Sequence, residues 1–219
     1  MPILHPASLQ AMDLRGVWYI FFGAALFVAV VVYGLILFSL LVWRKRPGDD
    51  GKLPPQFHTN APIEITGTVV PLIMVIGLFY VTYVREGTVD FLKPNPYAVV
   101  DVTAYRWSWQ FRYPGHGIEI AGTPHVPPEM ILPLGKMTQI NLYSVDVVHS
   151  FWVPAFLFKR DATPGYAMHF DITPTRLGVF RGECAEYCGL DHALMTFSVR
   201  VVPPAAYDRW AASGGTQAL

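Results

Sequence analysis

The sequence contains few cysteines, few charged residues and no excess charge of either sign. Two cysteines among 219 residues are too few for a disulfide-rich scaffold. Charged residues make up 15% of the chain, whereas about 25% is usual in soluble domains. Sixteen Lys and Arg residues balance sixteen Asp and Glu residues, and a nucleic-acid-binding domain would instead show a basic excess. The composition therefore argues against a disulfide-rich domain and against a partnership with nucleic acid.

Two long segments contain no charged residue at all. Residues 17–43 form a stretch of 27 residues and residues 65–84 a stretch of 20. About 20 apolar residues are enough to cross a bilayer as a helix, and the apolar part of a signal peptide is shorter, about 7–15 residues. A buried helix of a soluble protein is the alternative, but the first stretch is too long for it. We therefore predict an uncleaved transmembrane hairpin with spans over about 17–43 and 64–84.

The segment between the two spans is basic. It contains Arg44, Lys45, Arg46 and Lys52. Short loops rich in Lys and Arg stay on the cytoplasmic side, so both termini are expected on the outer, periplasmic side. This predicts a multi-pass protein of the cell inner (plasma) membrane. An N-terminal part, residues 1–96, comprises the hairpin and a linker, and an external domain follows over residues 97–219.

The external domain has the pattern of a β-protein. Residues 98–105, 139–145 and 197–202 are rich in β-branched side chains, and proline- and glycine-containing turns lie between such runs. Many short strands separated by turn signals favour a sandwich or a barrel. After Pro204 the sequence predicts a short helix over 205–212 and then a polar tail.

Both cysteines lie in one short loop that also contains other metal-binding side chains. Residues 184–195 follow the pattern Cys-x3-Cys-x3-His-x2-Met, and a separate His149 follows a predicted strand. Thiolate, imidazole and thioether groups together suit copper. Two thiolates can bridge two metal ions with one imidazole on each. The pattern therefore predicts a dinuclear copper centre with Met195 and a backbone carbonyl as weak ligands.

Two other interpretations of this loop remain open from the residues alone. An oxidising external compartment would permit a disulfide between Cys184 and Cys188. Two cysteines and two histidines could also bind zinc, although methionine is not a usual zinc ligand.

The chain resembles subunit II of the haem-copper cytochrome c oxidases. The resemblance rests on the loop at 184–195, the Val-His-Ser sequence at 148–150, the Asp-Ala-Thr-Pro-Gly turn at 161–165 and the aromatic run at 105–109, and the two-span hairpin also matches. It implies a cupredoxin-like Greek-key β-barrel with a dinuclear copper centre. In that family the centre accepts electrons from cytochrome c and passes them to a haem in subunit I, where oxygen is reduced; subunit III is a further expected partner.

The same resemblance implies a full set of metal ligands. The copper ligands by this match are His149, Cys184, the backbone carbonyl of Glu186, Cys188, His192 and Met195. The side chain of Glu186 would point towards a magnesium ion at the boundary with subunit I, and a carboxylate does suit such a hard cation.

Glu64 is a further residue that the resemblance singles out. It lies at the cytoplasmic mouth of the second span, where members of the family have a Glu near the entrance of a proton-conducting channel in subunit I. An ionisable residue at a membrane edge is a functional candidate. The alternative is a helix-capping carboxylate that interacts favourably with the helix dipole.

The resemblance also predicts where electrons enter. A Trp at the start of the aromatic run lies over the copper centre in the family, and the matching position here is Tyr105. We predict that Tyr105 receives the electron and that Trp107 packs beneath it. Strand alternation would place Tyr105, Trp107 and Trp109 on one face of a single strand, with Arg106 on the other.

Two functions are compatible with these residues. The first is the electron-transfer subunit of a terminal oxidase. The second is a membrane-anchored copper-binding or assembly protein, which would need exposed and exchangeable ligands. Ligands that converge from two parts of a β domain favour the fixed redox site. Residues 97–219 contain nine basic and ten acidic residues, so only moderate salt dependence of donor binding is expected.

Overall fold

The computed structural model describes residues 2–44, 48, 51, 56–90 and 92–219. The chain divides into two compact units, one formed by residues 1–15 and 85–219 and the other by residues 16–84. Lys45, Arg46 and Lys52, on which the predicted orientation in the membrane depends, lie outside the described residues. That orientation therefore stays a prediction.

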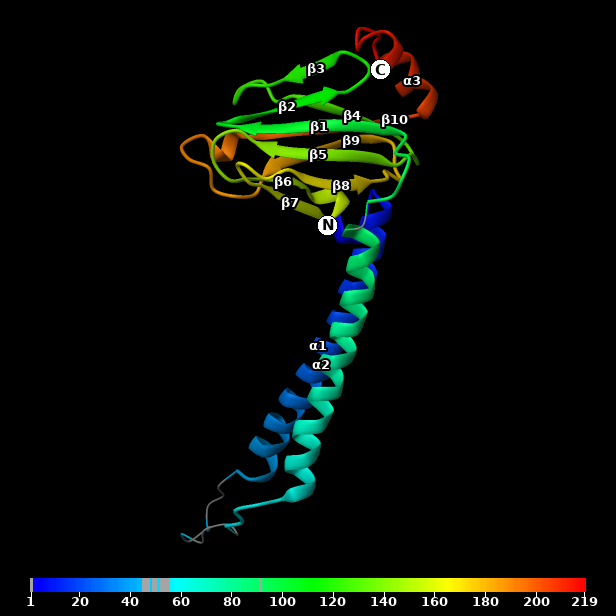
Figure 1. The fold of residues 1–219 in the computed structure, drawn as a ribbon. Coiled ribbons are helices and arrows are strands. Elements are labelled where there is room, and N and C mark those ends of the chain that lie inside the picture. The colour runs from blue at the N-terminus through cyan, green and yellow to red at the C-terminus, as the bar shows by residue number, and fades with distance from the viewer. Residues whose placement is uncertain (1, 45–47, 49–50, 52–55, 91) are drawn as a thin grey trace. The chain divides into compact units, whose positions relative to one another are not determined.

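Two long helices, α1 (Leu9–Val42) and α2 (Ala61–Asp90), correspond to the predicted spans (Figure 1). By length and composition, α1 and the Ala61–Gly87 part of α2 can each cross a membrane. The predicted pair of helices is thus confirmed, although α1 begins well before the charge-free stretch. It starts there because the hydroxyl of Ser8 accepts a hydrogen bond from the amide of Ala11 at 3.1 Å, which satisfies a free N–H in the first turn.

The remaining elements form a β domain with two five-stranded sheets. One sheet has the order β3-β2-β1-β5-β8 and the other β4-β10-β9-β6-β7. The strands are β1 (Ala98–Tyr105), β2 (Ser108–Tyr113), β3 (Ile118–Ala121), β4 (Glu129–Pro133), β5 (Thr138–Ser144), β6 (His149–Val153), β7 (Phe158–Ala162), β8 (Met168–Ile172), β9 (Gly178–Cys184) and β10 (Thr196–Val202). Short 3-10 helices occur at Pro2–Leu4 (η1), Pro154–Phe156 (η2) and His192–Leu194 (η3).

Parallel and antiparallel pairs are mixed in both sheets. β1 pairs antiparallel with β2 and parallel with β5, and β10 pairs antiparallel with β9 and parallel with β4. Alternate residues of β5 are buried, as expected for a sheet with one face in the core. The predicted all-β, cupredoxin-like domain is confirmed by this arrangement.

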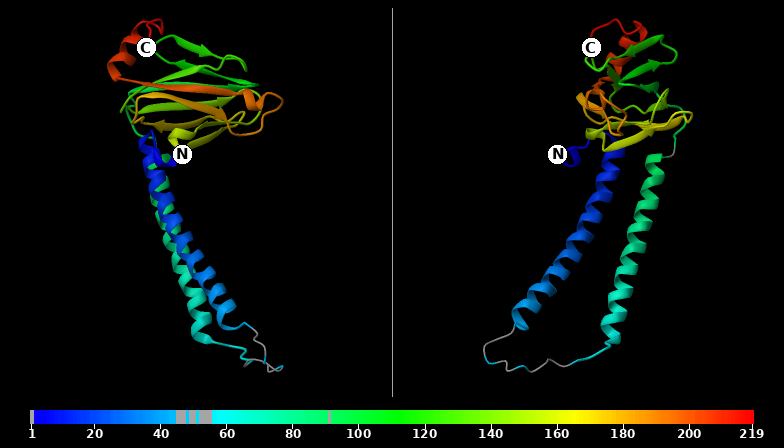
Figure 2. Two further views of the ribbon diagram at one scale, coloured as in Figure 1. Left: turned by 180° about the vertical axis from the view of Figure 1, so that it is seen from behind. Right: turned by 90° about the vertical axis from the view of Figure 1, so that its left-hand side faces the viewer.

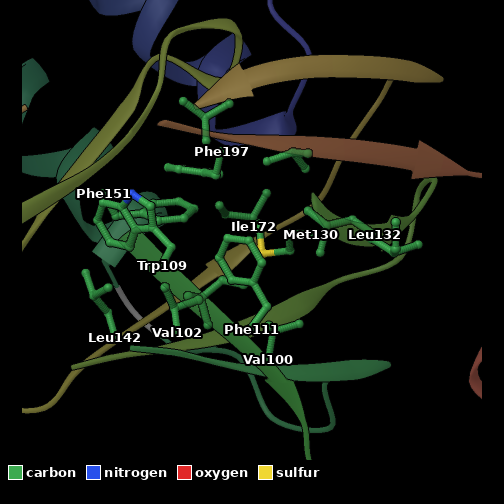
Figure 3. Packing of buried hydrophobic residues seen from close by; sticks show 14 of the residues in the cluster. Val100, Val102, Trp109, Phe111, Met130, Leu132, Leu142, Phe151, Ile172 and Phe197 are labelled. Carbon is green, nitrogen blue, oxygen red and sulfur yellow. The ribbon is translucent and has the colours of Figure 1, made fainter. Parts of the chain in front are cut away.

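Aromatic side chains fill the space between the sheets (Figure 3). The rings of Phe151 and Phe197 stack with centroids 4.8 Å apart, and Trp109 meets Phe197 edge-on at 5.3 Å. All three side chains are almost completely buried. Burial of each large apolar side chain contributes about 1.5–3 kcal/mol to stability, so these aromatic residues stabilise the packing of the two sheets.

The first residues of the chain are bound to the β domain. The amide of Ala7 donates to the carbonyl of Ala155 at 2.9 Å, and the amide of Thr175 donates to the carbonyl of Ala7 at 2.9 Å. Ala7 and Ala11 are fully buried. Residues 1–15, which the sequence places in the hairpin part, form one compact unit with residues 85–219.

The predicted C-terminal helix is present as α3 (Pro204–Ala212). Its Trp210 packs edge-on against Tyr113 of β2, with ring centroids 4.9 Å apart. Figure 2 shows α3 at one end of the β domain, whereas the loop that follows β9 extends at the opposite end. That loop contains the predicted copper ligands.

Candidate metal centre

Strand pairing brings the predicted ligands together from two distant parts of the chain. His149 is the first residue of β6 and Cys184 the last residue of β9. These strands are neighbours, with Phe151 paired to Cys184. The loop after β9 returns through η3 to β10, and the amide of Cys184 donates to the carbonyl of Met195 at 3.0 Å. The loop is therefore closed at its base, beside His149.

The two sulfur atoms lie side by side, with one imidazole next to each. The distance from Cys184 Sγ to Cys188 Sγ is 3.9 Å. His149 Nδ1 lies 3.8 Å from Cys184 Sγ, and His192 Nδ1 lies 3.6 Å from Cys188 Sγ. The donor atoms of His149, Cys184 and Cys188 all lie within 4.8 Å of one another.

Two weaker donors complete the group. Met195 Sδ lies 3.7 Å from Cys188 Sγ. On the other side, the carbonyl oxygen of Glu186 accepts a hydrogen bond from Cys184 Sγ at 3.2 Å. Each thiol therefore has an imidazole and one weak donor beside it.

The separations fit metal binding and not a disulfide. Metal–sulfur and metal–nitrogen bonds are about 2.3 and 2.0 Å long, so two donors on one ion at a tetrahedral angle lie roughly 3.5–3.8 Å apart. A disulfide needs an S–S distance near 2.05 Å, and both cysteines are free thiols. The disulfide interpretation of Cys184 and Cys188 is therefore wrong for this structure.

Four of the predicted ligand residues are shielded from water, whereas His192 is partly exposed. His149 and Met195 are fully buried, and the two cysteines are nearly so. Trp109 forms the inner wall: its ring lies 6.3 Å from that of His149, and its indole N–H donates to the carbonyl of Met195 at 3.4 Å. Gly182 leaves space for the ring of Phe197, which packs against Trp109. A Cβ at position 182 would lie 2.2 Å from that ring.

Asp146 orients His149, a role that the sequence alone does not predict. Its Oδ1 lies 2.8 Å from His149 Nε2, and its two oxygens also accept hydrogen bonds from the amides of Val147 and Arg106, both at 2.7 Å. Because Nε2 is engaged, Nδ1 remains free to bind a metal. The only signal in the sequence is a carboxylate three residues before the histidine.

The pKa values reflect these hydrogen bonds. Burial acts to raise the pKa of Asp146, but its hydrogen bonds with His149, Val147 and Arg106 outweigh burial and lower it to about 2. Burial acts to lower the pKa of His149, but its contacts with Cys184 and Asp146 outweigh burial and raise it. These hydrogen bonds favour the ionised form of Asp146, which faces the imidazole of His149.

The two thiols differ in acidity. Burial acts to raise the pKa of Cys184, but its hydrogen bonds with His149 and with backbone groups lower it overall. Burial and the negative charge of Cys184 raise the pKa of Cys188 well above the usual range. A cation placed between the two sulfurs would therefore favour the second thiolate by compensating its charge.

Comparisons with known proteins agree with this geometry. The family model described as cytochrome c oxidase subunit II, periplasmic domain, matches residues 123–202. A probable cytochrome c oxidase subunit 2 of Streptomyces avermitilis is 36% identical over 242 residues, which cover 93% of this chain and 76% of the relative. The chain belongs to the cytochrome c oxidase subunit II family.

Further relatives and solved structures support the same membership. A cytochrome c oxidase subunit 2 of Corynebacterium glutamicum is 34% identical over 251 residues, covering 88% of this chain and 70% of the relative. The crystal structure of the periplasmic domain of subunit II of cytochrome oxidase of Bradyrhizobium japonicum superimposes with a TM-score of 0.51 at 29% identity, covering 56% of this chain and 96% of that domain. Copper binding, electron transport and partnership with subunit I of a haem-copper oxidase follow from this family.

The aromatic run of this subunit II does not form one strand, which corrects the prediction. β1 ends at Tyr105, the chain reverses at Arg106 and Trp107, and β2 begins at Ser108, which pairs with Tyr105. Trp107 therefore lies in the turn and cannot alternate with Tyr105 and Trp109. The prediction failed because alternation holds only within a continuous strand.

The turn places Trp107 against the ligand loop. Its indole N–H donates to the carbonyl of Cys188 at 3.1 Å, and Gly189, with φ of +121°, leaves room for the ring. The hydroxyl of Tyr105 instead donates to the carbonyl of Gly122 at 2.7 Å. Of the two residues predicted for electron uptake, Trp107 is the one hydrogen-bonded to a predicted copper ligand.

The side chains of Glu186 and Glu64, the two carboxylates singled out from the sequence, are both exposed. The side chain of Glu186 is exposed on the ligand loop. Glu64 lies in the first turn of α2, where its Oε1 accepts a hydrogen bond from the amide of Asn60 at 2.8 Å, and Asn60 Oδ1 accepts one from the amide of Ile63 at 3.3 Å. Glu64 thus takes part in a helix cap, as the alternative interpretation expected, and its predicted role in proton uptake stays a prediction.

Proposed function

We propose that this chain is the electron-transfer subunit of a terminal respiratory oxidase and holds two copper ions in its β domain. The observation that carries the proposal is the pair of thiols 3.9 Å apart, each with an imidazole nitrogen within 3.8 Å. The proposed ligands are His149, Cys184, the carbonyl of Glu186, Cys188, His192 and Met195. When bound, the copper pair would supply one-electron exchange.

The chain's own residues hold this site in one geometry. Asp146 orients the ring of His149 through a hydrogen bond. Trp109 packs against the ring of His149 and donates a hydrogen bond to the carbonyl of Met195. A buried, apolar surrounding limits water access and tunes the potential of a metal site. Burial of His149, Met195 and the two cysteines also favours a fixed redox site over a copper carrier, whose ligands must be exposed for exchange.

The remaining assignments complete the proposed function. Electrons arrive from cytochrome c or a similar donor at the turn that contains Trp107, and they leave for a haem in subunit I. Glu186 faces a magnesium ion at the boundary with subunit I, and subunit III belongs to the same complex. The β domain and both termini lie on the outer side of the cell inner membrane, with the hairpin crossing it twice.

Copper binding to the purified full chain provides the direct test. On addition of copper and a mild reductant, we expect a purple protein whose electron paramagnetic resonance spectrum shows one unpaired electron shared by two copper ions. Removal of copper with a chelator should abolish the signal. A blue spectrum of a single copper ion, or no colour, would refute the proposed centre.

Glu64→Gln separates the two interpretations of Glu64. If the carboxylate helps protons to enter, turnover of the assembled oxidase should fall, while the copper spectrum stays unchanged. Glutamine retains an oxygen that can accept from the amide of Asn60, so the helix cap is preserved. Turnover equal to that of the unmodified enzyme across a broad pH range would leave Glu64 with the cap alone.

A further inference from the structure

Two apolar surfaces are exposed at the end of the β domain that carries the metal site. The first is on the ligand loop, where Tyr187 is 77% and Leu190 is 87% exposed. The second adjoins His149 and contains Val145, 67% exposed, Val148 and Tyr166. An electron-transfer subunit needs two contacts of different kinds, one with a permanent partner and one with a transient donor.

Backbone contacts assemble the second surface from three separate segments. The amide of Val145 donates to the carbonyl of Ala104 at 3.2 Å, which places Val145 beside the end of β1. A bridge between Ser144 and Pro164 brings the turn that precedes Tyr166 to the same place. We use the name docking rim for Arg106, Trp107, Val145, Val148 and Tyr166.

The docking rim is close to electrically neutral. Its only charged residue is Arg106, and the Nε of Arg106 lies 3.3 Å from Asp146 Oδ2. The side chain of Asp146 is only 19% exposed, and its oxygens are occupied by Arg106, Val147 and His149. The carboxylate of Asp146 is therefore engaged by groups of the same chain and offers no free negative charge to a partner.

We propose that the docking rim receives an electron-donor protein whose contact face is apolar and nearly neutral, rather than a donor that presents a ring of lysines. This inference rests on the proposed function. A protein that docks through lysines needs free carboxylates opposite them, whereas the docking rim offers two valines, two aromatic rings and a guanidinium group. Apolar contact with few charges gives association that depends little on salt.

The docking rim suits the transient partner better than the ligand loop does. Permanent interfaces are larger and more hydrophobic than transient ones, and the loop surface around Leu190 has the more exposed apolar side chains. The docking rim mixes apolar residues with an arginine, a composition common at interfaces. Its Trp107 donates directly to the carbonyl of Cys188, so a donor seated there would be separated from the ligands by one ring.

Val145→Glu in the assembled, copper-loaded oxidase tests the proposal. Oxidation of a lysine-rich cytochrome c would be followed by stopped flow at ionic strengths of about 0.01 and 0.15 M, where screening lengths are roughly 30 and 8 Å. The unmodified enzyme should change its rate by less than about threefold between the two. Val145→Glu should raise the low-salt rate about threefold, and the gain should vanish at the higher ionic strength.

Val179→Glu is the matched control, because Val179 is an exposed valine of β9 outside the docking rim. It should leave the rate unchanged at both ionic strengths. Two results would overturn the proposal: a more than tenfold fall in the rate of the unmodified enzyme with salt, or equal effects of Val145→Glu and Val179→Glu.

If the rate falls with salt and Asp161→Asn removes that salt dependence, docking would be assigned to this exposed carboxylate of β7 instead. The copper spectrum, recorded first, shows separately whether the proposed function itself holds.

Discussion

Replacement of either Cys184 or Cys188 by serine is expected to abolish the two-copper centre and electron uptake together. Each sulfur is needed, because the two thiols lie 3.9 Å apart and each is paired with a different imidazole. A hydroxyl is a hard, weakly acidic donor that does not replace a thiolate on copper. Electron paramagnetic resonance of the copper-loaded variants, together with the rate of cytochrome c oxidation, measures both losses.

Met195→Leu is the comparison for these variants. Met195 is fully buried like its neighbours, but a thioether is a weak ligand that tunes the potential more than it retains the metal. Leucine has nearly the same volume, so the fold should change little. Copper should remain bound with a shifted potential. A shared two-copper signal that survives in Cys184→Ser or in Cys188→Ser would contradict the proposed bridging role.

Trp107→Ala should lower kcat/KM for donor oxidation by about 30-fold. Large aromatic residues at the centre of an interface typically contribute 2 kcal/mol or more to association, which corresponds to that factor. Because Trp107 is only partly buried, its loss should cost less stability than the roughly 3–5 kcal/mol typical of a fully buried large aromatic residue. Steady-state kinetics and thermal unfolding of the same preparation measure the two effects.

Tyr105→Phe provides the contrasting variant. It removes only the hydroxyl that donates to the carbonyl of Gly122, which contributes about 1 kcal/mol. Donor oxidation should continue at the normal rate. If Tyr105→Phe slows the donor reaction while Trp107→Ala does not, the electron enters at Tyr105 and the role that we assign to the turn is wrong.

The aromatic run shows where reasoning from the sequence failed. Tyr105, Trp107 and Trp109 have the spacing of one strand face, and nothing in the residues between them announces a turn. The chain nevertheless reverses there, because β2 pairs antiparallel with β1 while β5 pairs with the other side of β1. A two-residue connection without glycine or proline gives no local signal, so only the sheet reveals it.

The fold class and the metal motif were predictable because their causes are local. A charge-free stretch of 27 residues predicts a membrane helix wherever it lies in the chain. Cys184, Cys188, His192 and Met195 lie within one loop, so their spacing alone brings them close together. Copper chemistry then follows from the softness of the donor atoms.

Tertiary structure alone decided how the site is completed and held. His149 meets Cys184 across 35 residues, Asp146 meets Arg106 across 40, and Trp107 meets Cys188 across 81. Each contact depends on which strands are neighbours and in which register, and sheet pairing is set by the burial of the whole core rather than by nearby sequence. The sequence therefore determines which residue types bind the metal. The pairing of the strands determines how His149 is oriented and that Trp107 lies against the ligand loop.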